Sequence, residues 1–143
     1  MPAAVSEAAS GRSLAAYPIH LGTAAGAQAQ SAFAPDERAM QWYSDYAERT
    51  AGDGRGARLV SMFRFTENWS TWEMHPHGAE VVLCTQGRMV LIQEHRDGRL
   101  EQVALAEGQY AINPPGVWHT ADIAGEATAV FITAGTDTQN RPR

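Results

Sequence analysis

A tight turn followed by a histidine, in the segment from Gly108 to His119, constrains the fold of this chain more than any other feature. The segment reads Gly-Gln-Tyr-Ala-Ile-Asn-Pro-Pro-Gly-Val-Trp-His. Pro115 and Gly116 suit the central positions of a type II turn, because proline presets the first φ and glycine accepts the positive φ that follows. The side chain of His119 is therefore held in a fixed direction at the start of a strand. A metal ligand needs this directional rigidity.

A second group of candidate ligands lies about forty residues upstream, in the segment from Trp72 to Gly87. His75 and His77 form a His-x-His pair, and Glu80 follows two residues beyond the pair. Six residues then separate Glu80 from Gly87. Histidine and glutamate at this spacing are candidates for the remaining ligands of a metal site.

These two segments resemble the two sequence signatures of the cupin superfamily. The downstream segment matches the second signature, G-x5-P-x-G-x2-H, through His119, and departs from it at Ile123, where the family has asparagine. The upstream segment resembles the first signature, H-x-H-x3/4-E-x6-G, but only two residues separate His77 from Glu80. The resemblance implies a small jelly-roll β-barrel, also called a double-stranded β-helix, in which these side chains bind a metal.

The shortened spacing leaves two ligand sets open. The first set, Glu73, His75, Glu80 and His119, preserves the register of the family, with Glu73 in the place of the first histidine. In an extended strand Glu73 and His75 project to the same face. The second set, His75, His77, Glu80 and His119, requires a tightened loop. We favour the first set and expect His77 at the rim, with Glu73 or His77 as the catalytic group that moves a proton.

Short β patterns at regular spacing fill the chain from Arg58 onward. Apolar runs are punctuated by glycine and proline, and Asp97-Gly98 suits a hairpin turn. This pattern is typical of an antiparallel sandwich or barrel. No internal repeat is present, so we predict an all-β fold with a single cupin-type jelly-roll barrel. The expected strands are Arg58–Phe65, Ser70–His75, Glu80–Thr85, Arg88–Glu94, Arg99–Leu105, Tyr110–Ile112 and Ala127–Thr133.

The N-terminal third differs in composition and is predicted to lie outside the barrel. Residues 1–35 are rich in Ala, Ser and Gly and suggest a flexible arm, with one short extended piece at Tyr17–Leu21. Asp36–Arg49 is predicted to be a short helix, since a proline precedes it and apolar residues recur at helical spacing. We therefore expect residues 1–56 to form an arm and helix that pack on the barrel or across a partner, and residues 57–143 to form the barrel.

The composition is typical of one soluble domain that does not bind nucleic acid. At 143 residues the chain is long enough to bury a core. A net charge of −5, without a Lys/Arg cluster, argues against nucleic-acid binding. Cys84 is the only cysteine, so no internal disulfide can form, which fits a reducing compartment. No signal-peptide pattern or membrane-spanning apolar stretch is found, and we expect a cytoplasmic protein.

Aromatic residues gather near the candidate ligands in the sequence. We expect them to form an apolar wall for a small organic substrate, since ligand pockets are commonly apolar around a few polar groups. The alternative for each of them is a place in the ordinary core, and Cys84 has the character of a small buried hydrophobe. The predicted pocket residues are Trp69, Trp72, Cys84, Tyr110 and Trp118.

Two imidazoles with one or two carboxylates suit one divalent transition metal, Fe, Mn, Ni, Co or Zn, without choosing among them. Such a centre can polarise a substrate, activate water, or bind a substrate and O2 together. We expect a metal-dependent enzyme of the dioxygenase, isomerase or lyase type that acts on a small organic metabolite. The alternative is a non-catalytic cupin that binds or senses a small ligand. Because an open sheet edge is a liability, we also expect a homodimer.

Overall fold

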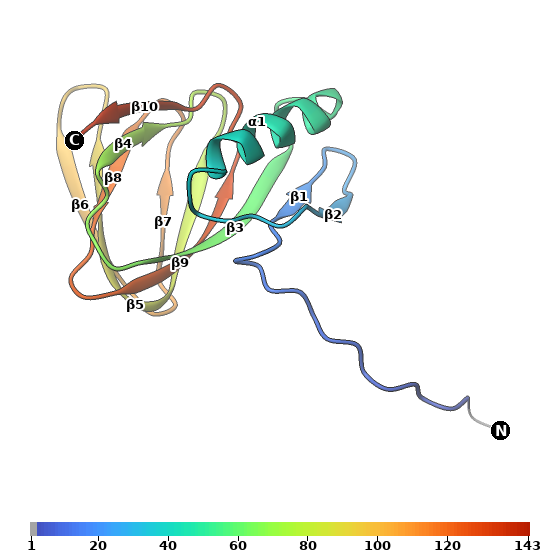
Figure 1. The fold of residues 1–143 in the computed structure, drawn as a ribbon. Coiled ribbons are helices and arrows are strands. Elements are labelled where there is room, and N and C mark those ends of the chain that lie inside the picture. The colour runs from blue at the N-terminus through green and yellow to red at the C-terminus, as the bar shows by residue number, and fades with distance from the viewer. Residues whose placement is uncertain (1–2) are drawn as a thin grey trace.

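The computed structural model describes residues 3–143 as a barrel of antiparallel strands with a helix and an extended N-terminal arm outside it (Figure 1). The arm leads into strands β1 (Ile19–Leu21) and β2 (Ala27–Ala29), and then into helix α1 (Ala39–Thr50) and the short 3-10 helix η1 (Ala51–Asp53). The barrel strands are β3 (Arg58–Phe65), β4 (Thr71–Met74), β5 (Glu80–Glu94), β6 (Leu100–Ala106), β7 (Tyr110–Asn113), β8 (Trp118–Asp122), β9 (Ala127–Thr133) and β10 (Gln139–Pro142).

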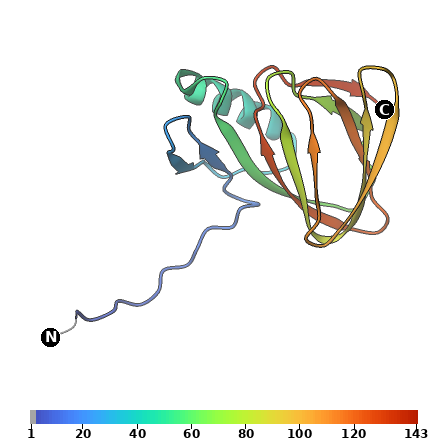
Figure 2. The same ribbon diagram turned by 180° about the vertical axis from the view of Figure 1, so that it is seen from behind.

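Strand β5 joins the two layers of the barrel. Its first half pairs with β7 and β9, and its second half, from Arg88, pairs with β6 and β8. One layer therefore has the order β7-β5-β9-β3-β1-β2, and the other has the order β10-β4-β8-β5-β6. Between the halves the register shifts from Cys84 to Gln86, and Gly87 adopts a φ of +73°, which glycine accepts without strain. This bulge bends β5 from one layer into the other, as the two opposite views show (Figures 1 and 2).

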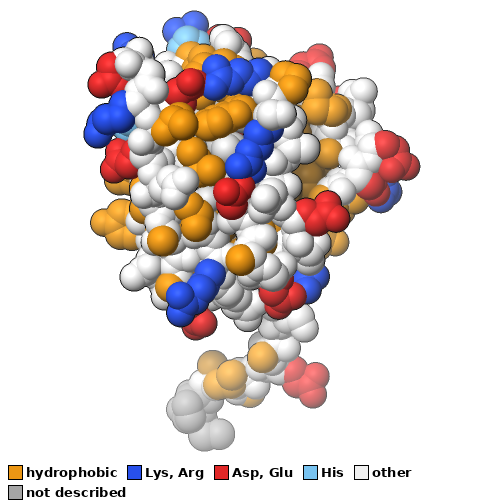
Figure 3. Space-filling model, turned by 90° about the vertical axis from the view of Figure 1, so that its left-hand side faces the viewer, with side chains coloured by type: hydrophobic (Ala, Val, Ile, Leu, Met, Phe, Trp, Pro, Cys, Tyr) orange, Lys and Arg blue, Asp and Glu red, His pale blue; other side chains and the backbone are white. Residues whose placement is uncertain are grey.

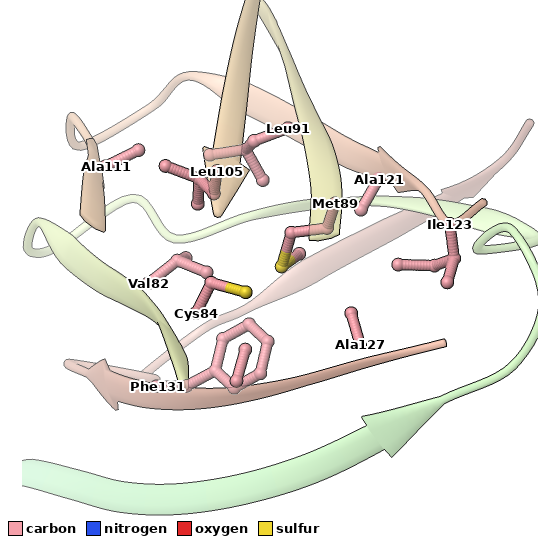
Figure 4. Packing of buried hydrophobic residues seen from close by; sticks show 11 residues of the cluster. Val82, Cys84, Met89, Leu91, Leu105, Ala111, Ala121, Ile123, Ala127 and Phe131 are labelled. Carbon is pink, nitrogen blue, oxygen red and sulfur yellow. The ribbon is translucent and has the colours of Figure 1, made fainter. Parts of the chain in front are cut away.

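The hydrophobic core lies between the two layers. Because side chains alternate along a strand, Val82 and Cys84 point inward from the first half of β5, and Met89 and Leu91 point inward from the second half. Phe131 of β9 packs against them (Figure 4). Each large aliphatic side chain buried in this way contributes about 1.5–3 kcal/mol. The core thus fixes the strands that carry the candidate ligands.

An aromatic cluster attaches helix α1 to the barrel. The ring of Phe33 lies 5.2 Å from that of Trp42 and 5.5 Å from that of Tyr43, both on α1. The same ring lies 5.5 Å from that of Phe63 on β3. Edge-to-face pairs at these distances are favourable beyond the area that they bury. The helix therefore has a defined position beside β3 (Figure 1).

A buried histidine holds β1 to α1 and η1. His20 of β1 is only 3% exposed. Its Nδ1 accepts a hydrogen bond from the Tyr46 hydroxyl, and its Nε2 donates to the Asp53 carboxylate, each at 2.6 Å. Both ring nitrogens are satisfied, so this histidine has a structural role between the N-terminal elements.

The all-β fold and the predicted strands are confirmed, with four differences. Glu80–Thr85 and Arg88–Glu94 form one strand, because the bulge keeps β5 paired throughout. Helix α1 begins at Ala39 and not at Asp36, because the Asp36 carboxylate accepts a hydrogen bond from the Arg38 backbone N–H (2.9 Å) and forms a turn first. Strands β2 and β10 were not predicted, since Ala-Gln-Ala is short and exposed and Gln-Asn-Arg-Pro is polar. Strand β8 was expected only as a strand that begins at His119, and it starts at Trp118.

Candidate metal centre

Strands β4 and β8 place Glu73 and His119 opposite each other on the inner face of the barrel. The two residues are direct partners in the antiparallel register, and such partners share a face. His119 is completely buried, whereas the Glu73 side chain is about a third exposed. The predicted turn precedes β8: Gly116 has a φ of +76°, and the Val117 N–H donates to the Pro114 carbonyl at 3.2 Å. The turn fixes the direction in which β8 presents its histidine.

His75 lies just beyond β4 and is held on two sides. Its backbone carbonyl accepts a hydrogen bond from the Gly116 N–H at 3.0 Å, which ties it to the turn before β8. Its Nδ1 lies 2.8 Å from the hydroxyl of Thr138, and that hydroxyl donates its own proton to the Gly135 carbonyl, also at 2.8 Å. A hydroxyl has one proton, so towards His75 it can only accept. His75 therefore carries a proton on Nδ1, which directs Nε2 to the site.

Glu80, the first residue of β5, brings a buried carboxylate between the two imidazoles. Its Oε2 lies 3.1 Å from His75 Nε2, and its Oε1 lies 3.2 Å from His119 Nε2. The Asn113 amide donates to Oε1 at 3.1 Å, and the Thr133 hydroxyl donates to Oε2 at 2.6 Å. Both carboxylate oxygens are therefore fixed in direction, as the supporting partners of a metal ligand would require.

The ligand atoms of Glu73, His75 and His119 lie within 4.8 Å of one another. Within the described part of the chain, His75 Nε2 and both ring nitrogens of His119 are buried and form no hydrogen bond of acceptable geometry, although the two Nε2 atoms lie 3.1 and 3.2 Å from the Glu80 carboxylate. Each buried polar atom left unpaired costs about 1–3 kcal/mol. A transition metal ion fits this arrangement, because imidazole nitrogens and carboxylates are the ligands that such ions take in proteins.

The buried charges of the site stabilise one another. Burial alone would lower the pKa of His119, but the carboxylates of Glu73 and Glu80 outweigh burial and raise that pKa to about 9. Burial alone would raise the pKa of Glu80, but His119 and His75 outweigh it and hold that pKa well below its ordinary range. Burial first, and then Glu73 and Glu80, also raise the pKa of Tyr43 on α1. A cation at the site would take the place of the His119 proton.

His77 lies apart from this group. Its side chain is a quarter exposed, and its Nε2 donates to the Asp137 carboxylate at 2.7 Å. The structure thus gathers the residues of the first predicted ligand set and leaves His77 at the rim. The roles of the four residues of the first set as metal ligands stay a prediction.

Trp69, one of the predicted pocket residues, lies against the site. It belongs to the loop between β3 and β4, and its ring centroid is 6.1 Å from that of His119 and 6.0 Å from that of Phe131. Its indole N–H is buried and has no partner among residues 3–143. The ring therefore forms an apolar wall beside His119, with one free donor.

The structure does not bring Trp72 and Trp118, two of the predicted pocket residues, together with the candidate ligands. Each directly precedes a candidate ligand in its strand, so the alternation of side chains turns it to the outer face. There the Arg141 guanidinium lies 5.2 Å from the Trp72 ring centroid and 4.5 Å from that of Trp118, and it pairs with Glu94. Figure 3 shows this side of the barrel, where hydrophobic side chains are interspersed with basic and acidic ones.

The structure does not bring Tyr110 and Cys84, two further predicted pocket residues, to the candidate ligands either. Tyr110 is 64% exposed, because Ala111 and Asn113 take the inward positions of β7. Cys84 faces inward but packs in the hydrophobic core with Met89, away from the ligands (Figure 4). Burial raises the pKa of its thiol, which fits a small buried hydrophobe.

Three residues that hydrogen-bond to the candidate ligands, Asn113, Thr133 and Thr138, were not predicted from the sequence. Asn113 could have been found from the strand alternation, since it shares the inward face with Ala111. Thr133 reaches Glu80 through the register of β5 with β9, and Thr138 reaches His75 from the loop before β10. No local pattern reports these long-range contacts.

Comparisons with known proteins agree with the fold. Residues 63–135, just over half of the chain, match the family described as Cupin domain. Among solved structures, Peruvianin-I, a cysteine peptidase from Thevetia peruviana latex, has a TM-score of 0.51 at 20% identity, covering 60% of this chain and 55% of that one. An oxalate oxidase in complex with the substrate analogue glycolate has a TM-score of 0.51 at 16% identity, covering 59% and 45%.

These structural similarities show the fold alone, and the chain spans about half the length of the structures that it matches. No curated protein matches the chain. Across residues 3–143, no helix has the length and apolar character that crossing a membrane requires.

Proposed function

This chain belongs to the cupin family, and we propose that it is a metal-dependent enzyme that acts on a small organic metabolite. The observation that carries the proposal is the pair of buried imidazoles, with unpartnered nitrogens facing two carboxylates. We assign Glu73, His75, Glu80 and His119 as the ligands of one divalent transition metal, Fe, Mn, Ni, Co or Zn.

The buried and the exposed side chains of the site have different proposed roles. A bound metal supplies Lewis-acid chemistry or a place where a substrate and O2 meet. His75 and His119 bind through neutral nitrogens, and Glu80, held by its two hydrogen-bond donors, fixes their spacing. Glu73 is the exposed member, so its carboxylate can take a proton from a substrate and return it. His77, at the rim, is the other candidate for that proton transfer.

The N-terminal segment contributes a phenol to the entrance of the site. The pKa of Tyr43 responds to the charges of Glu73 and Glu80, which places its hydroxyl within their field. We propose that Tyr43 contacts the substrate, while Trp69 excludes water beside His119. In this assignment residues 57–143 form the catalytic barrel, and residues 1–56 are an accessory segment packed against it.

Metal replacement combined with a substrate screen tests the proposed activity. Metal-stripped protein is reloaded with each of the five metals and incubated under air and under nitrogen with oxalate, glycolate, other small hydroxy acids and phenols. We expect turnover that depends on one metal. Oxygen uptake would identify an oxidase or dioxygenase, and turnover under nitrogen would identify an isomerase or lyase. Tight binding of metal and ligand without turnover would instead identify the non-catalytic binding or sensing cupin.

We further propose that the protein works in the cytoplasm as a homodimer, and that its partners are small molecules and not nucleic acid or membrane. The open edge strand β2 supports the dimer, since an unpaired strand edge is a template for pairing with a second copy.

A further inference from the structure

Gln93 is a buried polar residue on the inner face of β5 that has no role in the centre described above. Met89 and Leu91 share its face and belong to the hydrophobic core, so the alternation of this strand predicts an apolar side chain here. Gln93 is nevertheless only 5% exposed, and its direct partner on β8 is the candidate ligand His119. A buried amide is unfavourable unless it is hydrogen-bonded. The partners of Gln93 therefore indicate what it contributes.

An asparagine connects Gln93 to the buried glutamate of the site. Strand β5 bends between its two halves (Figures 1 and 2), with Glu80 at its start and Gln93 near its end. Asn113 of β7 is the direct partner of Glu80 and is 1% exposed. Gln93 Nε2 donates to Asn113 Oδ1 at 2.9 Å, and Asn113 Nδ2 donates to Glu80 Oε1 at 3.1 Å. A relay of two amides thus ends at the carboxylate.

A backbone carbonyl fixes the direction of this amide relay. Gln93 Nε2 also donates to the Ile112 carbonyl, at 2.9 Å. A carbonyl only accepts, so the atom of Gln93 that faces it must be the nitrogen. The atom of Asn113 that faces the same nitrogen must then be the acceptor Oδ1, which turns the NH2 group of Asn113 towards Glu80. In the reversed amide, the Asn113 oxygen would face the carboxylate with no proton between the two acceptors.

We propose that Gln93 is a positioning residue of the metal centre, which holds the Asn113 amide in the orientation that donates to Glu80. This inference rests on the proposed function, in which Glu80 is a metal ligand. Hydrogen-bond partners of a ligating carboxylate orient its oxygens and tune the affinity for the metal. Thr133 supplies the donor to Oε2 directly, at 2.6 Å, whereas the donor to Oε1 depends on the amide relay.

A double-mutant cycle tests whether Gln93 acts through Asn113. Gln93→Met keeps the length of the side chain and removes both donors. We expect metal affinity, measured by competition with a chelator, to fall about 10-fold, the lower end of the effect of losing an outer partner. In the Asn113→Ala background the same substitution should have almost no further effect, because the amide that Gln93 orients is absent. In the Thr133→Val background it should again lower the affinity about 10-fold, since Thr133 reaches the other carboxylate oxygen.

A purely structural role for Gln93 predicts a different result. The substitution would then lower the stability of the fold and leave the metal affinity of the folded protein unchanged. Unchanged affinity in Gln93→Met, or an equal loss in the wild-type, Asn113→Ala and Thr133→Val backgrounds, would overturn the proposal.

A reversal of polarity tests the direction of the relay. In Gln93→Glu, a carboxyl group accepts where the amide donated, so the Asn113 amide should turn its N–H towards this group and its oxygen towards Glu80. We expect metal affinity to fall further than in Gln93→Met, by about 100-fold. Gln102→Glu is the control, because Gln102 is exposed on β6 and adds the same charge away from the relay. Metal affinity in Gln93→Glu as high as in Gln102→Glu would overturn the proposal.

A measurement on the unaltered, metal-free protein decides the matter even if the Gln93 variants fail to fold. Nuclear magnetic resonance detects a scalar coupling across a hydrogen bond, and we expect one from Gln93 Nε2 to the side-chain carbonyl carbon of Asn113. A coupling in the reverse direction, from Asn113 Nδ2 to the side-chain carbonyl carbon of Gln93, would overturn the proposal. A wild type that binds no metal would instead contradict the proposed function, while the coupling would still report the direction of the relay.

Discussion

The hydroxyl of Thr138 accepts a hydrogen bond from the His75 Nδ1–H, because it donates its own proton in a hydrogen bond to the Gly135 carbonyl. Thr138→Val keeps the volume of the side chain but removes the acceptor, so the ring of His75 loses its fixed orientation. We expect metal affinity to fall about 10–100-fold, as is usual when the supporting partner of a histidine ligand is lost. Competition with a chelator measures the change.

Thr138→Ser is the matched control, since it retains the hydroxyl and should bind metal almost as tightly as the wild type. Equal affinity of the Val and Ser variants would show that the hydroxyl does not position His75.

The stability of the metal-free protein should depend on the protonation of His119. The pKa of His119 is raised in the folded state to about 9, from about 6.5 in the unfolded chain, because Glu73 and Glu80 outweigh the effect of burial. A raised pKa stabilises the fold fully below pH 6.5, and this contribution is lost as the pH rises through 9. The unfolding temperature of the metal-free protein should therefore fall between pH 6.5 and 9.

His119→Gln is the control for this prediction, because it should flatten the profile in that window. A wild-type profile as flat as that of the variant would contradict the assignment. Metal uptake should rise over the same pH range, since the metal displaces the His119 proton.

The sequence predicted which candidate ligands lie together better than it predicted their surroundings. The P-x-G-x2-H spacing located His119, and strand alternation placed Glu73 and His75 on one face. The same alternation, applied to Trp72 and Trp118, would have turned both rings to the outer face, and our prediction ignored it. Nearness in sequence to a ligand was a poor guide, because neighbours in a strand point in opposite directions.

Strand β5 depends on Gly87, where it passes from one layer of the barrel to the other. A Cβ at this position would lie 2.1 Å from the Glu126 backbone carbonyl oxygen, and the φ of +73° already disfavours a side chain. Gly87→Ala should therefore lower the free energy of unfolding by about 2–4 kcal/mol, the sum of backbone strain and a forced shift. Urea denaturation measures the loss.

Gly98→Ala in the β5–β6 hairpin is the matched control. Its φ is +85°, but nothing lies within 4 Å of the added Cβ. Gly98→Ala should lower the free energy of unfolding only through backbone strain, by about 1–2 kcal/mol. Equal losses for the two variants would show that the contact with Glu126 does not constrain β5.

The strands with regular apolar runs could be predicted from the sequence, the edge strands β6 and β7 included, and the edge strands β2 and β10 could not. Strands β3 and β9 have the predicted bounds because each has the central place of a sheet layer and a continuous apolar pattern. Strands β2 and β10 lie at sheet edges, where one neighbour suffices and polar residues or Pro142 are tolerated. Their pairing depends on the rest of the barrel and leaves no local signal.

For the molecule as a whole, the two signatures predicted the barrel but not what surrounds it. The family match covers residues 63–135, whereas Tyr43 comes from α1 and Thr138 from the loop before β10, both outside it. In the proposed assignment, the N-terminal segment and the loop before β10 thus add side chains to the metal centre. These additions are where the substrate preference of this chain is expected to differ from that of its relatives.

The metal content of the purified protein tests the proposed centre most directly. Protein prepared without a histidine tag should contain about one transition metal ion per chain, bound by neutral imidazole nitrogens and by carboxylates. Glu73→Gln, His75→Ala and His119→Ala should each lose most of the metal while the unfolding transition is retained. His77→Ala, with its bond to Asp137 at the rim, should keep the metal. Full metal content in all four variants, or no metal in the wild type, would contradict the proposed centre. Loss of metal in His77→Ala with retention in Glu73→Gln would instead assign the second ligand set.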